Sequence, residues 1–163
     1  MPLTDSKAML IYAQKNGFAV GAFNANNMEV AQAIVSAAEE EQAPVIVQIS
    51  EGAVKYAGEQ CMFSIVKSLA DRATVPVVCH LDHGVNYDTV IRCLRAGYTS
   101  LMFDGSSLPE EENINITKEL VKIAHSAGIP FEGEVGKIPD AAKGPLSPEE
   151  LKKYLTTPEE ALE

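Results

Sequence analysis

The chain of 163 residues contains no tryptophan, only three cysteines and no long apolar run. Cys61, Cys79 and Cys93 are odd in number and lack C-x-x-C spacing, which argues against a disulfide framework or a zinc ribbon and predicts buried free thiols. No apolar stretch approaches the roughly 20 residues that cross a bilayer. The first residues, MPLTD, form neither the basic end nor the apolar core of a signal peptide. We therefore expect a cytoplasmic protein with no membrane partner.

Basic residues are also scarce. Thirteen Lys and Arg against 23 Asp and Glu give a formal net charge of −10. Because no basic stripe is available for phosphates, we expect no nucleic-acid partner. A phosphorylated small molecule would be repelled overall, so a site for one must depend locally on a metal or on helix N-termini.

Short β-branched runs alternate with segments of helical periodicity along what reads as a single domain, residues 1–163. Helices are predicted over about 27–42, 86–96 and 110–126, with a further helical stretch through 63–69. Strands are predicted at 19–23, 45–49, 75–81, 99–103 and 129–135. Helices of this length between apolar strands indicate βα units with parallel strands and right-handed crossovers.

Both the open doubly wound sheet and the closed (β/α)8 barrel fit this order of elements. Polar groups at the carboxyl end of every strand converge on one point only if the strands close into a barrel. No G-x-G-x-x-G or G-K-[ST] loop follows any strand, as a nucleotide site would require. We therefore predict an α/β fold, a (β/α)8 TIM barrel, of which this chain supplies about the first five βα units. The polar residues at the predicted strand ends are Asn24, Ser50, Asp82 with His83, Asp104, and Glu132 with Glu134.

Eight strands close such a barrel, and five are predicted here. Thr157 as N-cap and Pro158 at the first helical position, followed by two acids, predict a helix that starts just before the last residue, Glu163. A helix that ends within a turn or two is too short to be stable alone. We expect an incomplete N-terminal part of a TIM barrel, whose two open sheet edges are covered by a complementary C-terminal segment or by further copies.

The run His80-Leu81-Asp82-His83-Gly84 is the sharpest local signal. An imidazole beside a carboxylate offers one metal ligand and one acid/base group, which are the two groups needed to break a C–C bond next to a carbonyl. Taken alone, the Asp-His pair also fits a helix cap followed by a hydrogen-bonded histidine.

The later carboxylates have structural alternatives as well. Asp104 precedes Gly105 and fits a turn. Glu132 and Glu134 lie two apart on a strand and therefore on one face, where two buried carboxylates are unfavourable unless they are paired or bound to metal. Solvated charges at the strand end are the alternative for this pair.

Together, the strand-end motifs resemble those of the class II fructose- and tagatose-bisphosphate aldolases. The resemblance covers roughly residues 2–136, in order, and rests on GAFN from Gly21, ISEG from Ile49, HLDHG from His80, FDGSSLPEEENI from Phe103 and EGEVG from Glu132. It implies a zinc-dependent lyase of glycolysis that reversibly cleaves fructose 1,6-bisphosphate, or a close ketose 1,6-bisphosphate, into glycerone phosphate and glyceraldehyde 3-phosphate.

The resemblance also implies roles for single residues. His83 matches the first of three histidines on the catalytic zinc, which acts as a Lewis acid on the ketone. Asp82 matches the acid/base that handles the proton on the aldehyde-derived hydroxyl. Asp104 and Glu134 match ligands of a second divalent metal. A class I aldolase would instead need a Schiff-base lysine, and none of the five predicted strands contains one.

On the same basis, Ser50 is expected to contact the triose half of the sugar phosphate and Asn24 to lie near the substrate. The family's other two zinc histidines and its phosphate-binding loops lie beyond the fifth strand, so the 163-residue chain alone is expected to be inactive and to bind zinc poorly. The loop after Glu134, which carries a proton-abstracting acid in many relatives, has Asp140 as its only carboxylate.

Two further readings stay open. One is another metal-dependent barrel lyase with a different keto substrate, and the other is a non-catalytic interaction module on the same fold. The expected partners of the enzyme are a small sugar phosphate, the complementary C-terminal segment of the barrel, and further copies in a homo-oligomer.

Overall fold

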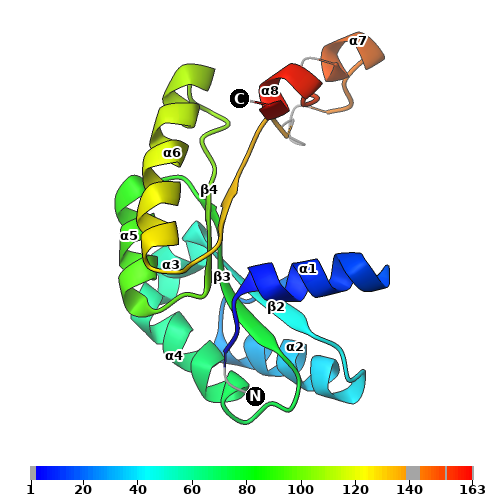
Figure 1. Ribbon diagram of the computed structural model, residues 1–163, viewed down its shortest axis with the longest axis vertical. Coiled ribbons are helices and arrows are strands. Elements are labelled where there is room, and N and C mark those ends of the chain that lie inside the picture. Colours follow the sequence, from blue (N-terminus) through cyan, green and yellow to red (C-terminus); the bar gives the residue numbers. More distant parts are fainter. Residues whose placement is uncertain (1–2, 139–143, 153, 163) are drawn as a thin grey trace.

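The computed structural model describes residues 3–138, 144–152 and 154–162, so Asp140 lies outside the described residues. Five strands form one parallel sheet (Figure 1). The strands are β1 (Gly21–Asn24), β2 (Val45–Ser50), β3 (Val77–Gly84), β4 (Ser100–Phe103) and β5 (Phe131–Gly133). The helices up to the last strand are α1 (Ser6–Asn16), α2 (Met28–Glu40), α3 (Glu51–Ala57), α4 (Glu59–Ala70), α5 (Tyr87–Ala96) and α6 (Glu110–Ser126).

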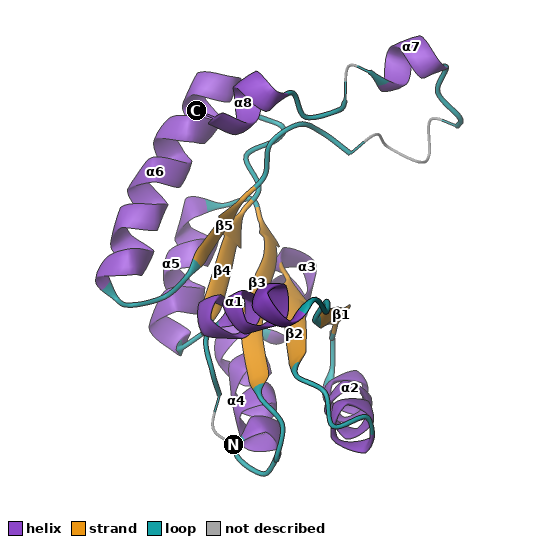
Figure 2. Ribbon diagram, turned by 45° about the vertical axis from the view of Figure 1, so that its right-hand side comes forward, coloured by secondary structure: helices purple, strands orange, loops and turns teal. Residues whose placement is uncertain are grey.

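The strands lie side by side in their sequence order, β1-β2-β3-β4-β5. A doubly wound sheet reverses its strand order at a switch point, whereas a (β/α)8 barrel adds each strand beside the previous one. Helices α4, α5 and α6 lie along one face of the curved sheet, and α1 crosses the opposite face (Figure 2). This arrangement is the first part of a barrel wall and confirms the predicted α/β architecture.

The main core lies between the strands and the outer helices. Because the inner strands are covered on both faces, their side chains are apolar in near-continuous runs. Burying one Val or Leu side chain stabilises the fold by about 1.5–3 kcal/mol. The buried strand residues of this outer face are Val45, Val47, Ile49, Val77, Cys79, Leu81, Leu101 and Phe103.

Helix α1 was not predicted from the sequence, and it covers the amino-terminal part of the inner face. Asp5 caps it by accepting a hydrogen bond from the backbone N–H of Ala8 at 3.1 Å. Met9 packs against Ile46 and Val78 on the inner side of the sheet. Helix α1 therefore covers the inner face of the sheet near the amino ends of the strands, and the polar residues at the carboxyl ends of the strands lie beyond it.

The edge strands are shorter and more exposed than expected. The fifth strand was predicted over 129–135, but only Phe131–Gly133 pair with β4. Within the described ranges, no strand pairs with the other side of β5. All four residues of β1 are exposed, and Phe23 is 54% exposed. The first and last strands of the sheet therefore have open edges.

The residues after β5 include α7 (Pro148–Leu151) and α8 (Pro158–Leu162). The predicted cap of α8 is confirmed, since the backbone N–H of Glu160 donates to Thr157 Oγ1 at 3.2 Å.

Cys79 and Cys93 are buried as predicted, whereas the prediction for Cys61 is wrong because its helix face is exposed. None of the helices in the described ranges has the length and apolar character needed to cross a membrane.

Candidate metal and substrate site

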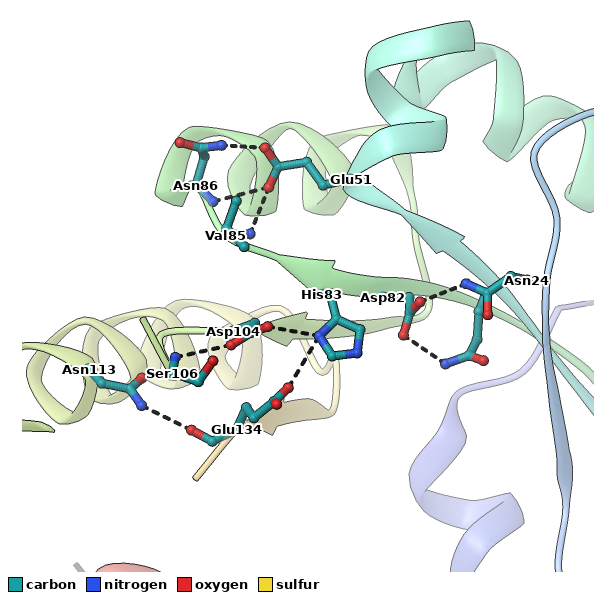
Figure 3. Close-up of polar contacts among 11 residues, drawn as sticks. Asn24, Glu51, Asp82, His83, Val85, Asn86, Asp104, Ser106, Asn113 and Glu134 are labelled. Atoms are coloured by element: carbon teal, nitrogen blue, oxygen red, sulfur yellow. Dashed lines mark hydrogen bonds and ion pairs between the residues drawn. The ribbon is translucent and has the colours of Figure 1, made fainter. Parts of the chain in front are cut away.

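The structure brings His83, Asp104 and Glu134 together at the carboxyl ends of β3, β4 and β5 (Figure 3). Nδ1 of His83 lies 2.8 Å from Oδ2 of Asp104 and 3.2 Å from Oε2 of Glu134. One donor atom from each of the three residues lies within 4.8 Å of the other two. Ligand atoms bound about 2.0–2.2 Å from a zinc ion lie roughly 3–3.5 Å from one another. The three side chains therefore fit a divalent ion once Nδ1 of His83 and Oδ2 of Asp104 move slightly apart.

The backbone of His83 explains how its side chain reaches the mouth of the barrel. Regular alternation along β3 would place His83 on the outer face, opposite Asp82. The pairing of β3 with β4 instead shifts register between Leu81 and Gly84, and His83 takes a φ of 47°. A non-glycine residue at positive φ is uncommon, and such strain concentrates at functional sites. The irregular strand end therefore lets Asp82 and His83 both face the site.

The charges in this cluster shift one another's pKa values. The hydrogen bond to Asp104 raises the pKa of His83 above its ordinary value despite partial burial. Burial opposes ionisation of Asp104, but hydrogen bonds from Ser106 and His83 outweigh it and lower the pKa of Asp104. Burial and the adjacent Asp104 raise the pKa of Glu134. A cation between the two carboxylates would relieve their repulsion.

The carboxylate of Asp82 is held at both oxygens by side-chain amides. Nδ2 of Asn24 donates to Oδ2 at 2.6 Å (Figure 3), and Nε2 of Gln48 donates to Oδ1 at 2.9 Å. Asp82 is only 8% exposed, so its position is fixed by β1, β2 and β3 together. Gln48 was missed in the sequence analysis, although a polar residue two positions before Ser50 on a buried strand was a signal for it.

Ser50 ends β2 next to Asp82 in the strand register. Its Oγ accepts a hydrogen bond from the backbone N–H of Ala53 at 3.2 Å and so caps α3. The hydroxyl proton is not used by this cap, so Ser50 can still donate a hydrogen bond into the site.

Glu51 follows Ser50 and holds the turn after β3. Its buried carboxylate accepts hydrogen bonds from the backbone N–H groups of Val85 at 2.6 Å and Asn86 at 3.2 Å, and from the Asn86 side chain. Burial opposes its ionisation, but these bonds and Lys55 together lower the pKa of Glu51. No role for Glu51 was predicted from the sequence.

A second group of hydrogen-bonded polar side chains lies on the amino-terminal side of the metal-ligand candidates. Nδ1 of His80 lies 2.8 Å from Oγ of Ser100, which lies 2.9 Å from Oγ of Ser6 on α1. Burial lowers the pKa of His80 to about 4 despite the nearby charge of Asp82. The imidazole is therefore neutral near pH 7, and its 3.7 Å contact with Glu132 is not an ion pair under those conditions. Of the two strand-end glutamates, Glu132 thus approaches His80 and Glu134 approaches His83.

Comparison with known proteins gives consistent matches. The model of the family described as "Fructose-bisphosphate aldolase class-II" matches residues 4–163. A fructose-bisphosphate aldolase of Streptococcus pyogenes is 47% identical over 156 residues, which are 93% of this chain and 52% of that protein. One from Thermus caldophilus is 46% identical over 159 residues, with 98% and 52% covered. The chain therefore spans about half the length of the curated relatives it matches.

Two solved structures share the fold. A putative fructose-1,6-bisphosphate aldolase from Coccidioides immitis superposes with a TM-score of 0.82 at 33% identity, covering 95% of this chain and 54% of that one. The YdjI aldolase from Escherichia coli K12 gives a TM-score of 0.77 at 36% identity, covering 82% and 52%. These structures agree with the barrel assignment made from the strand order.

Proposed function

Because the chain belongs to the class II fructose-bisphosphate aldolase family, we propose that it forms the first part of an enzyme that reversibly cleaves fructose 1,6-bisphosphate, or a close ketose 1,6-bisphosphate. The products are glycerone phosphate and glyceraldehyde 3-phosphate. The observation that carries the proposal is the grouping of His83, Asp104 and Glu134 beside the amide-held Asp82.

Asp82 is the proposed acid/base. As the C–C bond breaks, Asp82 accepts the proton from the hydroxyl on the carbon that becomes the aldehyde, and the electron pair stays with the ketone half. Asn24 and Gln48 orient the carboxylate for this transfer, because each donates to a different oxygen.

His83, Asp104 and Glu134 are the proposed metal-binding residues of this chain. His83 belongs to the catalytic zinc site, and Asp104 with Glu134 to a second divalent position that His83 Nδ1 also approaches. When bound, the zinc ion polarises the ketone carbonyl as a Lewis acid. A catalytic zinc commonly has three protein ligands, so we propose that the ligands missing from this chain come from the rest of the barrel.

The substrate half of the site is formed by Ser50 and Asn24 in this proposal. Ser50 donates its hydroxyl to the triose half, and Asn24 lies at the end of β1, opposite Gln48, where its amide also orients Asp82. With a net charge of −10, the chain offers no broad attraction for phosphates. We therefore assign the phosphate-binding loops to the remaining strands, and we place the enzyme in the cytoplasm, where charged sugar phosphates are retained.

The proposed macromolecular partner is the complementary C-terminal segment. Strands β1 and β5 leave two open edges, and a hollow of about 940 Å³ lies between α1 and the residues that lead into β5. Its lining includes Leu10, Ile11 and Phe131, so it has apolar side chains that a further strand would cover. Copies of the full eight-stranded barrel are proposed to associate as a homo-oligomer.

A second candidate is an aldolase of the same metal-dependent kind with another keto substrate. The specific observation that favours it is the similarity to the YdjI aldolase, which is named as an aldolase without a substrate. The non-catalytic module is the third reading, and it predicts no turnover with any substrate.

A substrate panel separates these candidates. The chain is combined with a separately produced C-terminal half of the Streptococcus pyogenes relative, and we call this assembly the completed barrel. The loss of each ketose and the formation of its two carbonyl products are followed by chromatography with fructose 1,6-bisphosphate, tagatose 1,6-bisphosphate and an unphosphorylated ketose, since the last of these releases no triose phosphate. The proposal predicts the highest kcat/KM for a ketose 1,6-bisphosphate. Preference for the unphosphorylated sugar would favour the second candidate.

A further inference from the structure

Asn113 lies in the second turn of α6 and belongs to none of the proposed metal, acid/base or substrate groups. Its Nδ2 donates a hydrogen bond to the backbone carbonyl of Glu134 at 2.9 Å (Figure 3). Pairing of β5 with β4 ends at Gly133, so Glu134 lies one residue beyond the strand ladder. The amide of Asn113 therefore holds the backbone of a metal-ligand candidate at the point where the sheet no longer does.

The same side chain packs against the residue that follows Asp104. A Cβ atom built on Gly105 would overlap Oδ1 of Asn113 and would also lie 2.9 Å from Cε1 of Phe103. Real Cβ atoms do not approach other atoms so closely, so only glycine leaves room for the amide here. Asn113 thus contacts the segments that carry both carboxylates of the metal cluster.

The orientation of the amide is fixed by a neighbour on the same helix. Oγ1 of Thr117 donates to Oδ1 of Asn113 at 3.1 Å, across the i, i+4 spacing of a helix. With its oxygen occupied by Thr117, the amide directs its nitrogen toward the carbonyl of Glu134. The contact is therefore directional rather than a loose packing contact.

We propose that Asn113 is a positioning residue that sets the separation between the carboxylates of Asp104 and Glu134 and thereby the affinity and geometry of the metal site. The inference rests on the proposed metal-binding role of His83, Asp104 and Glu134. Asn113 acts through the backbone of Glu134 and the close approach at Gly105. Groups that orient metal ligands in this way commonly change metal affinity by about 10- to 100-fold when they are removed.

The test compares Asn113→Ala with Asn16→Ala in a titration of the metal-free chain with Co²⁺, followed by visible absorption. Asn16 is a matched control, because its Nδ2 also donates to a backbone carbonyl, that of Tyr12 at 2.8 Å, but in α1 far along the chain from the cluster. We expect about 10- to 100-fold weaker Co²⁺ binding and an altered spectrum for Asn113→Ala. Asn16→Ala should match the wild type in both.

Gly105→Ala tests the close approach separately. We expect it to weaken Co²⁺ binding as Asn113→Ala does, because the new methyl group displaces the amide. In the double variant the overlap with the Asn113 amide is gone and only the close contact with Phe103 remains, so the loss of Co²⁺ affinity should be smaller than the sum of the two single losses. If the double variant loses as much Co²⁺ affinity as the two single variants together, Gly105→Ala does not act by displacing the Asn113 amide.

The outcomes separate this inference from the metal proposal. If the wild type binds Co²⁺ and Asn113→Ala binds it equally well, the inference is overturned. If the wild type binds no Co²⁺, His83, Asp104 and Glu134 do not hold a metal ion without the rest of the barrel, and the imidazole NMR signals of His83 in the metal-free protein decide the inference. Signals moved by Asn113→Ala but not by Asn16→Ala support it, and unmoved signals overturn it. If Asn113→Ala does not fold, Thr117→Val replaces it under the same criteria.

Discussion

Strands β3 and β1 belong to one sheet but differ in strand pairing and in burial. β3 is paired on both sides and all but one of its residues are buried, whereas β1 is paired only with β2 and all its residues are exposed. Side chains of β3 are consequently fixed by packing within this chain. Groups at the edges are held by single hydrogen bonds, such as those from Asn24 to Asp82 and from Asn113 to Glu134. The centre of the site is preformed, and we propose that the rest of the barrel completes its edges.

The largest effect is expected from Asp82, at the preformed centre. Asp82→Ala should lower the kcat of the completed barrel by about 10²- to 10⁴-fold, because a positioned acid/base group contributes that much. The KM should change far less, since Ser50 and the metal ligands remain. Steady-state kinetics measure both values. Asp71→Ala is the control, because Asp71 is an exposed partner of Lys67 on the outer surface, and a similar loss there would contradict the assignment.

Packing of the central strand gives the next effect. Leu81 is fully buried between β3 and the outer helices. Leu81→Ala should lower the free energy of unfolding by about 2–5 kcal/mol through lost burial and the cavity left behind. Urea unfolding followed by circular dichroism measures this change. A loss below that range would indicate that β3 is not the rigid centre described here.

The buried His80 predicts a pH dependence of stability. Burial lowers its folded-state pKa to about 4, below the ordinary histidine value of 6.5, so folding favours the neutral imidazole. This contribution is complete above pH 6.5 and is lost as the pH falls toward 4. Over that window the free energy of unfolding should drop by about 3 kcal/mol more in the wild type than in His80→Gln. Equal slopes for the two proteins would show that His80 is not buried in its neutral form.

The smallest effect on the isolated chain is expected at the open edge. Phe23 is 54% exposed on β1, so Phe23→Ala should change the free energy of unfolding of this chain by no more than about 0.5 kcal/mol. The same change should weaken association with the C-terminal half, because that half covers the β1 edge. Isothermal titration calorimetry measures the association, and an unchanged affinity would contradict burial of this edge.

Much of the fold was predictable because apolar periodicity reports local structure directly. Helix α6 occupies the predicted residues, and β2 begins at the predicted Val45. Helix α1 was missed because its buried residues, Ser6, Met9 and Ala13, are too few and too small to form a clear apolar stripe. Strand β5 was predicted too long, since its length depends on pairing partners that the sequence does not identify.

The site residues at the strand ends could be predicted from the sequence, but the residues that hold their side chains and backbone in place could not. His83, Asp104 and Glu134 lie together in the structure because they follow neighbouring parallel strands. The partners that hold these groups come from distant parts of the chain, as Gln48 does for Asp82 and Asn113 for Glu134. Their contacts depend on strand register and on the irregular backbone at His83, neither of which a sequence pattern specifies.

The most direct measurement titrates the C-terminal half of the Streptococcus pyogenes relative into this chain and follows fructose 1,6-bisphosphate cleavage, with light scattering to record complex formation. The account predicts no turnover by either half alone and a rate that saturates at one half per chain. It also predicts that a chelator abolishes this rate and added Zn²⁺ restores it. A one-to-one complex without activity, or activity that survives complete metal removal, would contradict it.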